Sequence, residues 1–295
     1  MKVTVLINCY NAEKFIKSSI QSVFSQTYKN WKLLIWDDAS TDKTLKIVES
    51  FKSRKIKIFK NKKNLGLGKS RLLAEKKIKT KYVAILDADD KFEKNKLEKL
   101  MKYFVKDKSL GLIASDYFLI NELGKKLKKP PLILDDKNLL KNFCENNYFK
   151  HSTIMYNKFI AKKLGGYSKK LKYSQDYDLT IRMMRYSKVK YLRQQLAFYR
   201  MSNLNMSSDN SLRYLRTSER LYILKKIARL FNLGDHLTKM NLDAQKLCEI
   251  ICIYVSTNMN LAYKIYIFLF EFIKRPKIIL IITDFLFKKF ILKKQ

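Results

Sequence analysis

Proline, glycine and histidine are scarce in this sequence, whose 295 residues include 3 Pro, 7 Gly and 2 His. So little Gly and Pro excludes a collagen-like or low-complexity chain. The four cysteines form no Cys-x-x-Cys pair, and with so few histidines a structural zinc site is not expected. Hydrophobic residues still make up 47% of the sequence. We therefore expect a sizeable folded core, with the cysteines as buried free thiols.

Long apolar segments are absent as well. No uninterrupted apolar run reaches the length of a membrane span. The amino terminus, MKVTVLINCYN, leads directly into a predicted strand and lacks the pattern of a signal peptide. These two absences predict a cytoplasmic protein.

Acidic residues are few relative to basic ones, with 26 Asp and Glu against 62 Lys and Arg and a formal net charge of +36. Such an excess attracts polyanions, which include nucleic acids, anionic lipids and phosphorylated ligands. The alternative is a compositional preference for lysine, since lysines occur all along the chain. No RNP, zinc-finger or helix-turn-helix signature is present, so no specific nucleic-acid partner is expected.

The first half of the chain alternates between short apolar runs and segments with helical spacing. This βαβα order predicts an α/β fold with a Rossmann-like, mainly parallel sheet and helices on both faces. Ligands of such sheets bind beyond the carboxyl ends of the strands. The predicted strands are Val3–Ile7, Trp31–Trp36, Ile56–Phe59, Tyr82–Leu86 and Leu110–Ala114, and the predicted helices are Ala12–Phe24, Thr41–Phe51, Gly68–Ile78 and Lys94–Phe104.

Polar side chains directly follow three of the predicted strands. They are Asn8 and Tyr10 after the first strand, Asp37 and Asp38 after the second, and Asp87, Asp89 and Asp90 after the fourth. Each aspartate taken alone is a common helix cap or turn residue. Three strands that end in polar groups at one rim favour a ligand site instead.

Asp87 and Asp89 are two residues apart, so their carboxylates point the same way in an extended or turn segment. Ligation by oxygen alone, with no histidine nearby, favours Mg²⁺ or Mn²⁺. Such a cation can bridge a diphosphate and neutralise charge as a phosphate ester leaves.

The segment GLGKS at residues 66–70 ends like a phosphate-binding P-loop but does not fit one. A P-loop needs a glycine five residues before Gly68, where Lys63 stands. The dinucleotide motif GxGxxG also fails, because Arg71 occupies its third glycine position. We interpret Gly66 and Gly68 as loop and helix-start residues.

Four segments of the chain follow one another in the order and spacing of a known family. They are VTVLINCYNAEKFIKSSIQSVFSQTYKNWKLLIWDDASTDKT, NLGLGKSRLLAEKKIKTKYVAILDADD, GGY at Gly165–Tyr167, and SQDYDLTIRM from Ser174 onward. Together they resemble the family 2 glycosyltransferases, which have the GT-A fold. The resemblance extends over roughly residues 1–207, and joint order and spacing are far more specific than any single motif.

The resemblance implies roles for individual side chains. Asp176 is implied as the catalytic base that accepts the proton of the acceptor hydroxyl, with Asp178 as a competing candidate. Asp176 also suits the first turn of a helix, where the dipole favours a carboxylate, and both roles can hold together. Asp87 and Asp89 are the implied metal ligands. The implied contacts of the nucleotide sugar are Asn8, Tyr10, Asp38, Arg71, Asp87 and Arg200.

Two positions depart from the family's pattern. Gln175 stands where the family usually has Glu, and Ser202 stands where many relatives have His. A hydroxyl is a poor substitute for an imidazole ligand, which puts a third protein ligand of the metal in doubt. His151 precedes a predicted strand, STIMY, and it either faces the acceptor or is a structural histidine.

The pattern changes after about residue 210, which predicts a catalytic domain over residues 1–210 and a helical region over residues 211–295. Leu212–Phe231 and Ala244–Val255 are predicted amphipathic helices. Two apolar, aromatic-rich stretches follow, broken by Glu271, by Lys274–Lys277 and by Asp284. Basic residues beside such stretches fit a helix in an anionic membrane interface. The alternative is packing on the catalytic domain or on a second subunit.

The sequence as a whole predicts an inverting, metal-dependent glycosyltransferase that uses a nucleoside-diphosphate sugar, expected to be UDP-linked. The expected acceptor is a hydroxyl of a glycan or lipid-linked saccharide in cell-surface polysaccharide or glycoconjugate synthesis. The alternatives are a nucleotidyltransferase with a Rossmann-like fold and a basic nucleic-acid-binding protein. A nucleotidyltransferase more often has a glycine-rich, basic stretch at its amino terminus, where this chain has INCYNAEKF. No motif specifies the sugar or the oligomeric state.

Overall fold

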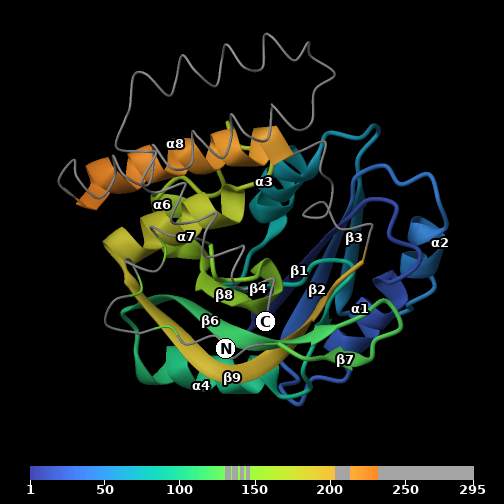
Figure 1. The fold of residues 1–295 in the computed structure, drawn as a ribbon. Helices are drawn as coiled ribbons and strands as arrows, with labels where there is room; N and C mark the ends of the chain where they lie inside the picture. Colours follow the sequence, from blue (N-terminus) through green and yellow to red (C-terminus); the bar gives the residue numbers. More distant parts are fainter. Residues whose placement is uncertain (130–133, 135–138, 140–142, 144–146, 203–212, 232–295) are drawn as a thin grey trace, which may run out of the picture. The chain divides into compact units, whose positions relative to one another are not determined.

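A computed structural model describes residues 1–129, 134, 139, 143, 147–202 and 213–231. The chain divides into two compact units, Met1–Ser208 and Asp209–Gln295. Within the first unit, a nine-stranded sheet has the strand order β3-β2-β1-β4-β8-β6-β9-β5, with β7 paired to β6 (Figure 1).

One half of the sheet is parallel. Its strands, in sheet order, are β3 (Ile56–Lys60), β2 (Trp31–Asp37), β1 (Val3–Cys9) and β4 (Tyr82–Ile85). The connecting helices are α1 (Ile16–Phe24), α2 (Thr44–Glu49) and α3 (Leu67–Lys77). These strands read as nearly continuous apolar runs because helices cover both faces of a parallel sheet.

The other half of the sheet is mixed. Strand β8 (Ile154–Asn157) is antiparallel to both β4 and β6 (Leu110–Ile120), whereas β6 is parallel to β9 (Lys188–Arg200). Two short strands, β5 (Lys91–Phe92) and β7 (Lys126–Leu127), pair antiparallel with β9 and β6. The remaining helices of this unit are α4 (Lys96–Lys106), the 3₁₀ turn η1 (His151–Thr153), α6 (Lys158–Lys163) and α7 (Gln175–Tyr186). The predicted α/β class is confirmed, and the sheet as a whole is mixed.

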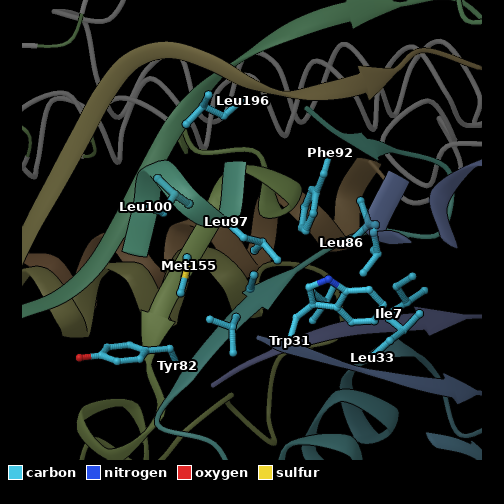
Figure 2. Close-up of a cluster of buried hydrophobic side chains, with 14 of the residues drawn as sticks. Ile7, Trp31, Leu33, Tyr82, Leu86, Phe92, Leu97, Leu100, Met155 and Leu196 are labelled. Carbon is cyan, nitrogen blue, oxygen red and sulfur yellow. The ribbon is translucent and has the colours of Figure 1, made fainter. Parts of the chain in front are cut away.

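The hydrophobic core lies between the sheet and helices α1, α2 and α4. Helix α4 buries Leu97 and Leu100 against the strands, and Phe92 and Leu196 lie close to them in Figure 2. The three- and four-residue spacing of the apolar positions in α4 produces this buried stripe. Helices α3, α6 and α7 lie on the opposite side of the sheet (Figure 1). Truncating a core leucine such as Leu97 to Ala is expected to cost about 2–5 kcal/mol.

The predicted elements of the first half are present, with shifted ends. Strand β6 continues beyond the predicted Ala114 to Ile120, and β9 was not predicted. The pairing of β6 with β9 contains register shifts around Ser115 and Asp116. Such bulges reverse the inward and outward alternation on which sequence patterns depend, so β9 does not show a clean period of two.

The second unit contains helix α8 (Arg213–Phe231), which agrees with the helix predicted from Leu212. Its Ile223 and Ile227 are buried, whereas Leu215 and Tyr222 are exposed. Apolar side chains therefore lie on both the buried and the exposed sides of this helix. The predicted helix Ala244–Val255 and the apolar stretches after it lie outside the described residues. No helix in the described ranges combines the length and apolar character needed to cross a bilayer.

Candidate active site

Two loops at the carboxyl ends of β1 and β2 are bonded to each other. The N–H of Asn11 donates to Ser40 Oγ at 3.0 Å, and the N–H of Thr41 donates to Asn11 Oδ1 at 2.9 Å. The backbone is left-handed at Asn11, with φ of +47°, and at Ala39, with φ of +62°. Asparagine tolerates this region, but in alanine it costs about 1–3 kcal/mol. Such backbone strain persists where surrounding hydrogen bonds enforce the conformation, and it is found most often at functional sites.

Three predicted nucleotide contacts lie at this rim. The ring of Tyr10 is 48% exposed and accessible to a ligand. Asp38 is buried, and its Oδ1 accepts from Asn61 Nδ2 at 2.7 Å and from the N–H of Leu65 at 2.9 Å. The side-chain Nδ2 of Asn8 is buried without a hydrogen-bond partner. A buried donor without an acceptor is costly, and a ligand oxygen at this rim would relieve it.

Asp87 belongs to a bonded group of four side chains, with Arg71, His151 and Tyr167. Arg71 Nη2 and His151 Nδ1 each lie 3.4 Å from Asp87 Oδ1, and His151 Nε2 lies 3.0 Å from Tyr167 Oη. Arg71 and His151 are buried, but the Asp87 side chain is 35% exposed. Burial would raise the pKa of Asp87, yet the hydrogen bond with His151 and the charge of Arg71 outweigh it and lower that pKa. Asp87 is therefore held ionised while a ligand can still reach it.

Asp89 and Asp90 complete a group of three neighbouring carboxylates. Burial and the charge of Asp87 raise the pKa of Asp89 to about 6. Burial and the charge of Asp89 also raise the pKa of Asp90, whose Oδ1 accepts the N–H of Arg200 at 2.8 Å. Three carboxyl groups are thus crowded at this point of the rim, which disfavours ionisation of Asp89 and Asp90.

A divalent cation fits this rim only if it takes further ligands from outside the protein. In the described part of the chain, no three His, Cys, Asp or Glu side chains are arranged to hold a metal. Asp87 and Asp89 offer carboxylate oxygens alone, which suits Mg²⁺ or Mn²⁺. Diphosphate and water oxygens normally supply the remaining positions around such a cation.

Arg200 is buried at the end of β9, and its guanidinium joins two segments. Nε donates to the carbonyl of Asp89 at 2.7 Å, and Nη1 donates to the carbonyls of Asn121 at 3.0 Å and Glu122 at 2.7 Å. The guanidinium carbon lies 4.5 Å from the ring centre of Phe15. The sequence predicts a phosphate contact for Arg200. In the structure, Nε and Nη1 donate to backbone carbonyls and hold the β6–β7 turn beside residues 87–89, the DxD segment.

The two candidate bases on α7 have different surroundings. Asp178 is 1% exposed, and its Oδ2 lies 2.6 Å from Arg182 Nη2 and 3.0 Å from Arg182 Nε. Arg182 also donates to the carbonyl of Gly166 at 2.6 Å. Asp176 is partly exposed, and Asn147 Nδ2 donates to its Oδ2 at 3.0 Å. Asp178 therefore has a structural partner, whereas Asp176 is accessible to a substrate.

Several polar groups near the site were not identified from the sequence. Ser152 Oγ accepts the N–H of Asp87 at 2.9 Å, and the Ser152 carbonyl accepts from Lys96 Nζ. Lys96 is fully buried, and burial lowers its pKa to about 7 despite the nearby charge of Asp90. The sequence pattern could have pointed to Lys96, because a lysine is unusual inside the apolar stripe of a predicted helix. Nothing in the pattern pointed to Asn147, which donates a hydrogen bond to Asp176.

The sequence matches one family model and several known proteins. A family model described as "Glycosyl transferase family 2" matches residues 4–165. The "Uncharacterized glycosyltransferase MJ1057" of Methanocaldococcus jannaschii is 37% identical over 185 residues, which are 61% of this chain and 63% of that protein. The "Putative glycosyltransferase EpsE" of Bacillus subtilis is 27% identical over 251 residues, 78% of this chain and 89% of that protein.

A third relative carries a specific name. The "UDP-Glc:alpha-D-GlcNAc-diphosphoundecaprenol beta-1,3-glucosyltransferase WfgD" of Escherichia coli is 37% identical over 142 residues, 48% of this chain and 55% of that protein. The chain thus spans less than two thirds of WfgD and of the Methanocaldococcus relative.

Solved structures share the architecture at low sequence identity. S. aureus TarS 1–349 in complex with UDP is 17% identical with a TM-score of 0.65, covering 88% of this chain and 76% of that chain. The mannosyltransferase PcManGT from Pyrobaculum calidifontis, in complex with GDP-Man and Mn²⁺, is 13% identical with a TM-score of 0.58. The match covers 93% of this chain and 81% of that chain. These likenesses confirm the predicted GT-A fold.

Proposed function

The chain belongs to glycosyl transferase family 2, and from this premise we propose the reaction it catalyses and the residues that carry it out. It is a glycosyltransferase with a GT-A fold. Family membership favours this activity over a nucleotidyltransferase or a basic nucleic-acid-binding protein. The proposed reaction moves one sugar from a nucleoside-diphosphate sugar to an acceptor hydroxyl, with inversion at the anomeric carbon.

The donor is a UDP-linked sugar. WfgD is named for a UDP-glucose donor, and TarS has been solved with UDP and with UDP-GlcNAc. The exposed ring of Tyr10 offers a face on which a base can stack. Asn8 and Asp38 contact the base and ribose from the carboxyl ends of β1 and β2, and the buried charge of Arg71 supports the nucleotide.

Asp87 and Asp89 hold a divalent cation, Mg²⁺ or Mn²⁺. When bound, the cation supplies positive charge that offsets the charge growing on the leaving diphosphate. The raised pKa of Asp89 supports the assignment, because crowded carboxylates favour a cation between them. Arg71 and His151 keep Asp87 ionised, and both contact its Oδ1. PcManGT was solved with Mn²⁺ and a nucleotide sugar.

Asp176 is the general base. Its carboxylate accepts the proton of the acceptor hydroxyl while the hydroxyl oxygen forms a bond to the anomeric carbon. The bond from that carbon to the diphosphate oxygen breaks on the opposite side, and the electron pair leaves with the diphosphate. The observation that carries this assignment is the contrast on α7, where Asp178 is committed to Arg182 and Asp176 is partly exposed beside Asn147.

The acceptor is a glycan or lipid-linked saccharide in cell-surface polysaccharide synthesis. WfgD is named for a diphosphoundecaprenol-linked acceptor, and TuaG of Bacillus subtilis, 33% identical over 129 residues, is named for teichuronic acid biosynthesis. A peripheral position on the inner face of the membrane suits such an acceptor. The basic, apolar region 211–295 contributes to that attachment.

The test is a screen of nucleoside-diphosphate sugars scored by release of nucleoside diphosphate, with EDTA and with added Mn²⁺. The proposal expects release from a UDP-sugar that needs both the cation and Asp176. Release that is unchanged in EDTA would remove the metal assignment. Activity that persists in Asp176→Asn but is lost in a folded Asp178→Asn variant would move the base to Asp178.

A further inference from the structure

The turn between β6 and β7 is a well-ordered projection at the rim of the site. The N–H of Gly124 donates to the carbonyl of Asn121, and the N–H of Asn121 donates to the carbonyl of Lys125, each at 2.9 Å. Asn121 Oδ1 accepts the N–H of Lys125 at the same distance. Gly124 has a φ of +83°, a conformation that glycine adopts without strain. These bonds within the turn give it a defined shape.

We name residues 118–128 the rim hairpin, and its outer surface is apolar at the tip. Leu123 is 94% exposed and Leu127 is 40% exposed. At its base, the ring of Phe118 stacks on that of Phe198, with centroids 5.0 Å apart. Lys126 Nζ lies 3.7 Å from the centre of the Phe118 ring. A single exposed leucine is ordinary, but Leu123 lies at the tip of a hairpin with an aromatic base.

The same hairpin carries a concentrated positive charge. Lys125, Lys126 and Lys128 are all exposed. Between residues 118 and 128 the one acidic side chain is Glu122, and Lys14 forms an ion pair with it. The hairpin thus combines an apolar tip with three lysines and a neutralised acid. This pattern matches elements that enter the boundary between lipid headgroups and acyl chains, where Leu is buried and Lys meets anionic headgroups.

The hairpin is also connected to the candidate active site. The Arg200 guanidinium donates to the carbonyls of Asn121 and Glu122 and to the carbonyl of Asp89. One side chain therefore fixes the distance between the hairpin and the DxD segment. Anything that binds the hairpin lies next to the rim where the sugar is transferred.

We propose that the rim hairpin docks the catalytic unit on an anionic lipid bilayer, with Leu123 inserted and Lys125, Lys126 and Lys128 on the headgroups. A bilayer fits better than a second protein, because one leucine and three lysines offer far less area than a stable protein interface needs. Docking itself does not depend on the proposed reaction. The consequence that the site meets a lipid-linked acceptor rests on the proposed function.

The first test places a fluorophore at the tip, using Leu123→Trp in the full chain. The two native tryptophans, Trp31 and Trp36, are buried and give a constant background. Vesicles of equimolar phosphatidylglycerol and phosphatidylethanolamine should shift the added emission to shorter wavelength, and brominated acyl chains should quench it. Val105→Trp is the matched control, since Val105 is 53% exposed on α4 and should show neither effect.

This design separates the hairpin from any membrane contact made by residues 211–295. Vesicle flotation of the full chain without a spectral change at position 123 would overturn the proposal. So would a shift that depends on protein concentration in the absence of lipid, because that result indicates self-association. Absence of both flotation and shift would overturn it equally. None of these readouts uses catalysis, so failure here is distinct from failure of the proposed reaction.

The second test concerns charge. Replacing Lys125 and Lys128 by Gln should weaken the vesicle affinity of the Leu123→Trp tip on the order of tenfold or more. The matched control replaces Lys46 and Lys76, which are exposed on α2 and α3, and should change the affinity much less. Phosphatidylcholine vesicles should bind the tip weakly in all variants. Equal losses from both lysine pairs would indicate attraction by the overall charge and would refute the assignment to the hairpin.

Discussion

Asp89→Asn should make the metal-free protein more stable even though it should remove activity. Burial and the charge of Asp87 raise the pKa of Asp89 from 3.8 to about 6. One pKa unit corresponds to about 1.4 kcal/mol, so a shift of roughly two units corresponds to about 3 kcal/mol. Asp89 is partly exposed, and screening by water reduces this to about 1–2 kcal/mol.

The effect should depend on pH with a definite sign. An acid with a higher pKa in the folded state than in the unfolded state opposes folding when it ionises. The penalty is absent below about pH 4, develops as the pH rises to about 6, and is complete above that. Asparagine carries no charge at any pH. The variant and the parent should therefore unfold at similar temperatures near pH 4, and the variant should unfold a few degrees higher near pH 8.

Thermal unfolding in EDTA at the two pH values measures this difference. Added Mn²⁺ with UDP should raise the unfolding temperature of the parent more than that of Asp89→Asn. Asp107→Asn is a control of opposite sign, because the hydrogen bond with Lys188 lowers the pKa of Asp107 to about 2. That variant should lose stability near pH 8. An Asp89→Asn variant that is less stable than the parent in EDTA at pH 8 would refute the electrostatic reasoning.

Three further substitutions test the surroundings of the proposed base, Asp176. Asp176→Asn should keep donor binding but lose turnover by about 10²–10⁴-fold, as measured by equilibrium binding and single-turnover kinetics. Asp178→Asn should destabilise the fold by about 3–5 kcal/mol, because it leaves the charge of Arg182 buried, and denaturant unfolding measures this. Gly68→Ala should cost about 1–3 kcal/mol and reduce turnover, because its Cβ would lie 1.9 Å from Nε2 of Gln175, the residue before the proposed base Asp176. Wild-type stability in either of the last two variants would contradict the packing described.

The parallel half of the sheet could be predicted because its strands are short apolar runs bounded by turn residues. The same patterns predicted that Asn8, Asp38 and Asp87 would meet at one rim, since the carboxyl ends of parallel strands share an edge. The structure places Asn8 near the carboxyl end of β1, Asp38 directly after β2, and Asp87 in the segment after β4. Local sequence is sufficient here, because each residue's position follows from the strand that precedes it.

The contacts of His151 could not be predicted in the same way. Its partner Asp87 is 64 residues away, and their pairing depends on β8 lying antiparallel beside β4. From the sequence, His151 was either a contact of the acceptor or a structural residue. In the structure its two ring nitrogens face Asp87 and Tyr167. The sequence pattern also could not decide between Asp176 and Asp178 as the base. The burial of Asp178 depends on Arg182, which bonds both Asp178 and the backbone of Gly166.

Arg200→Lys distinguishes two roles for the residue at the end of β9. As a phosphate contact, Arg200 would act on donor binding, and lysine, which lacks the planar fork, would raise the donor KM while leaving the turn intact. As an organiser, it needs separate donors for the carbonyls of Asp89, Asn121 and Glu122, and an ammonium on a flexible stem does not reproduce that planar fork. The geometry favours the second role. We expect Arg200→Lys to lose turnover and to expose the 121–125 turn to proteolysis, while donor KM changes less than kcat. An unchanged cleavage pattern with a raised KM alone would assign Arg200 to the phosphate.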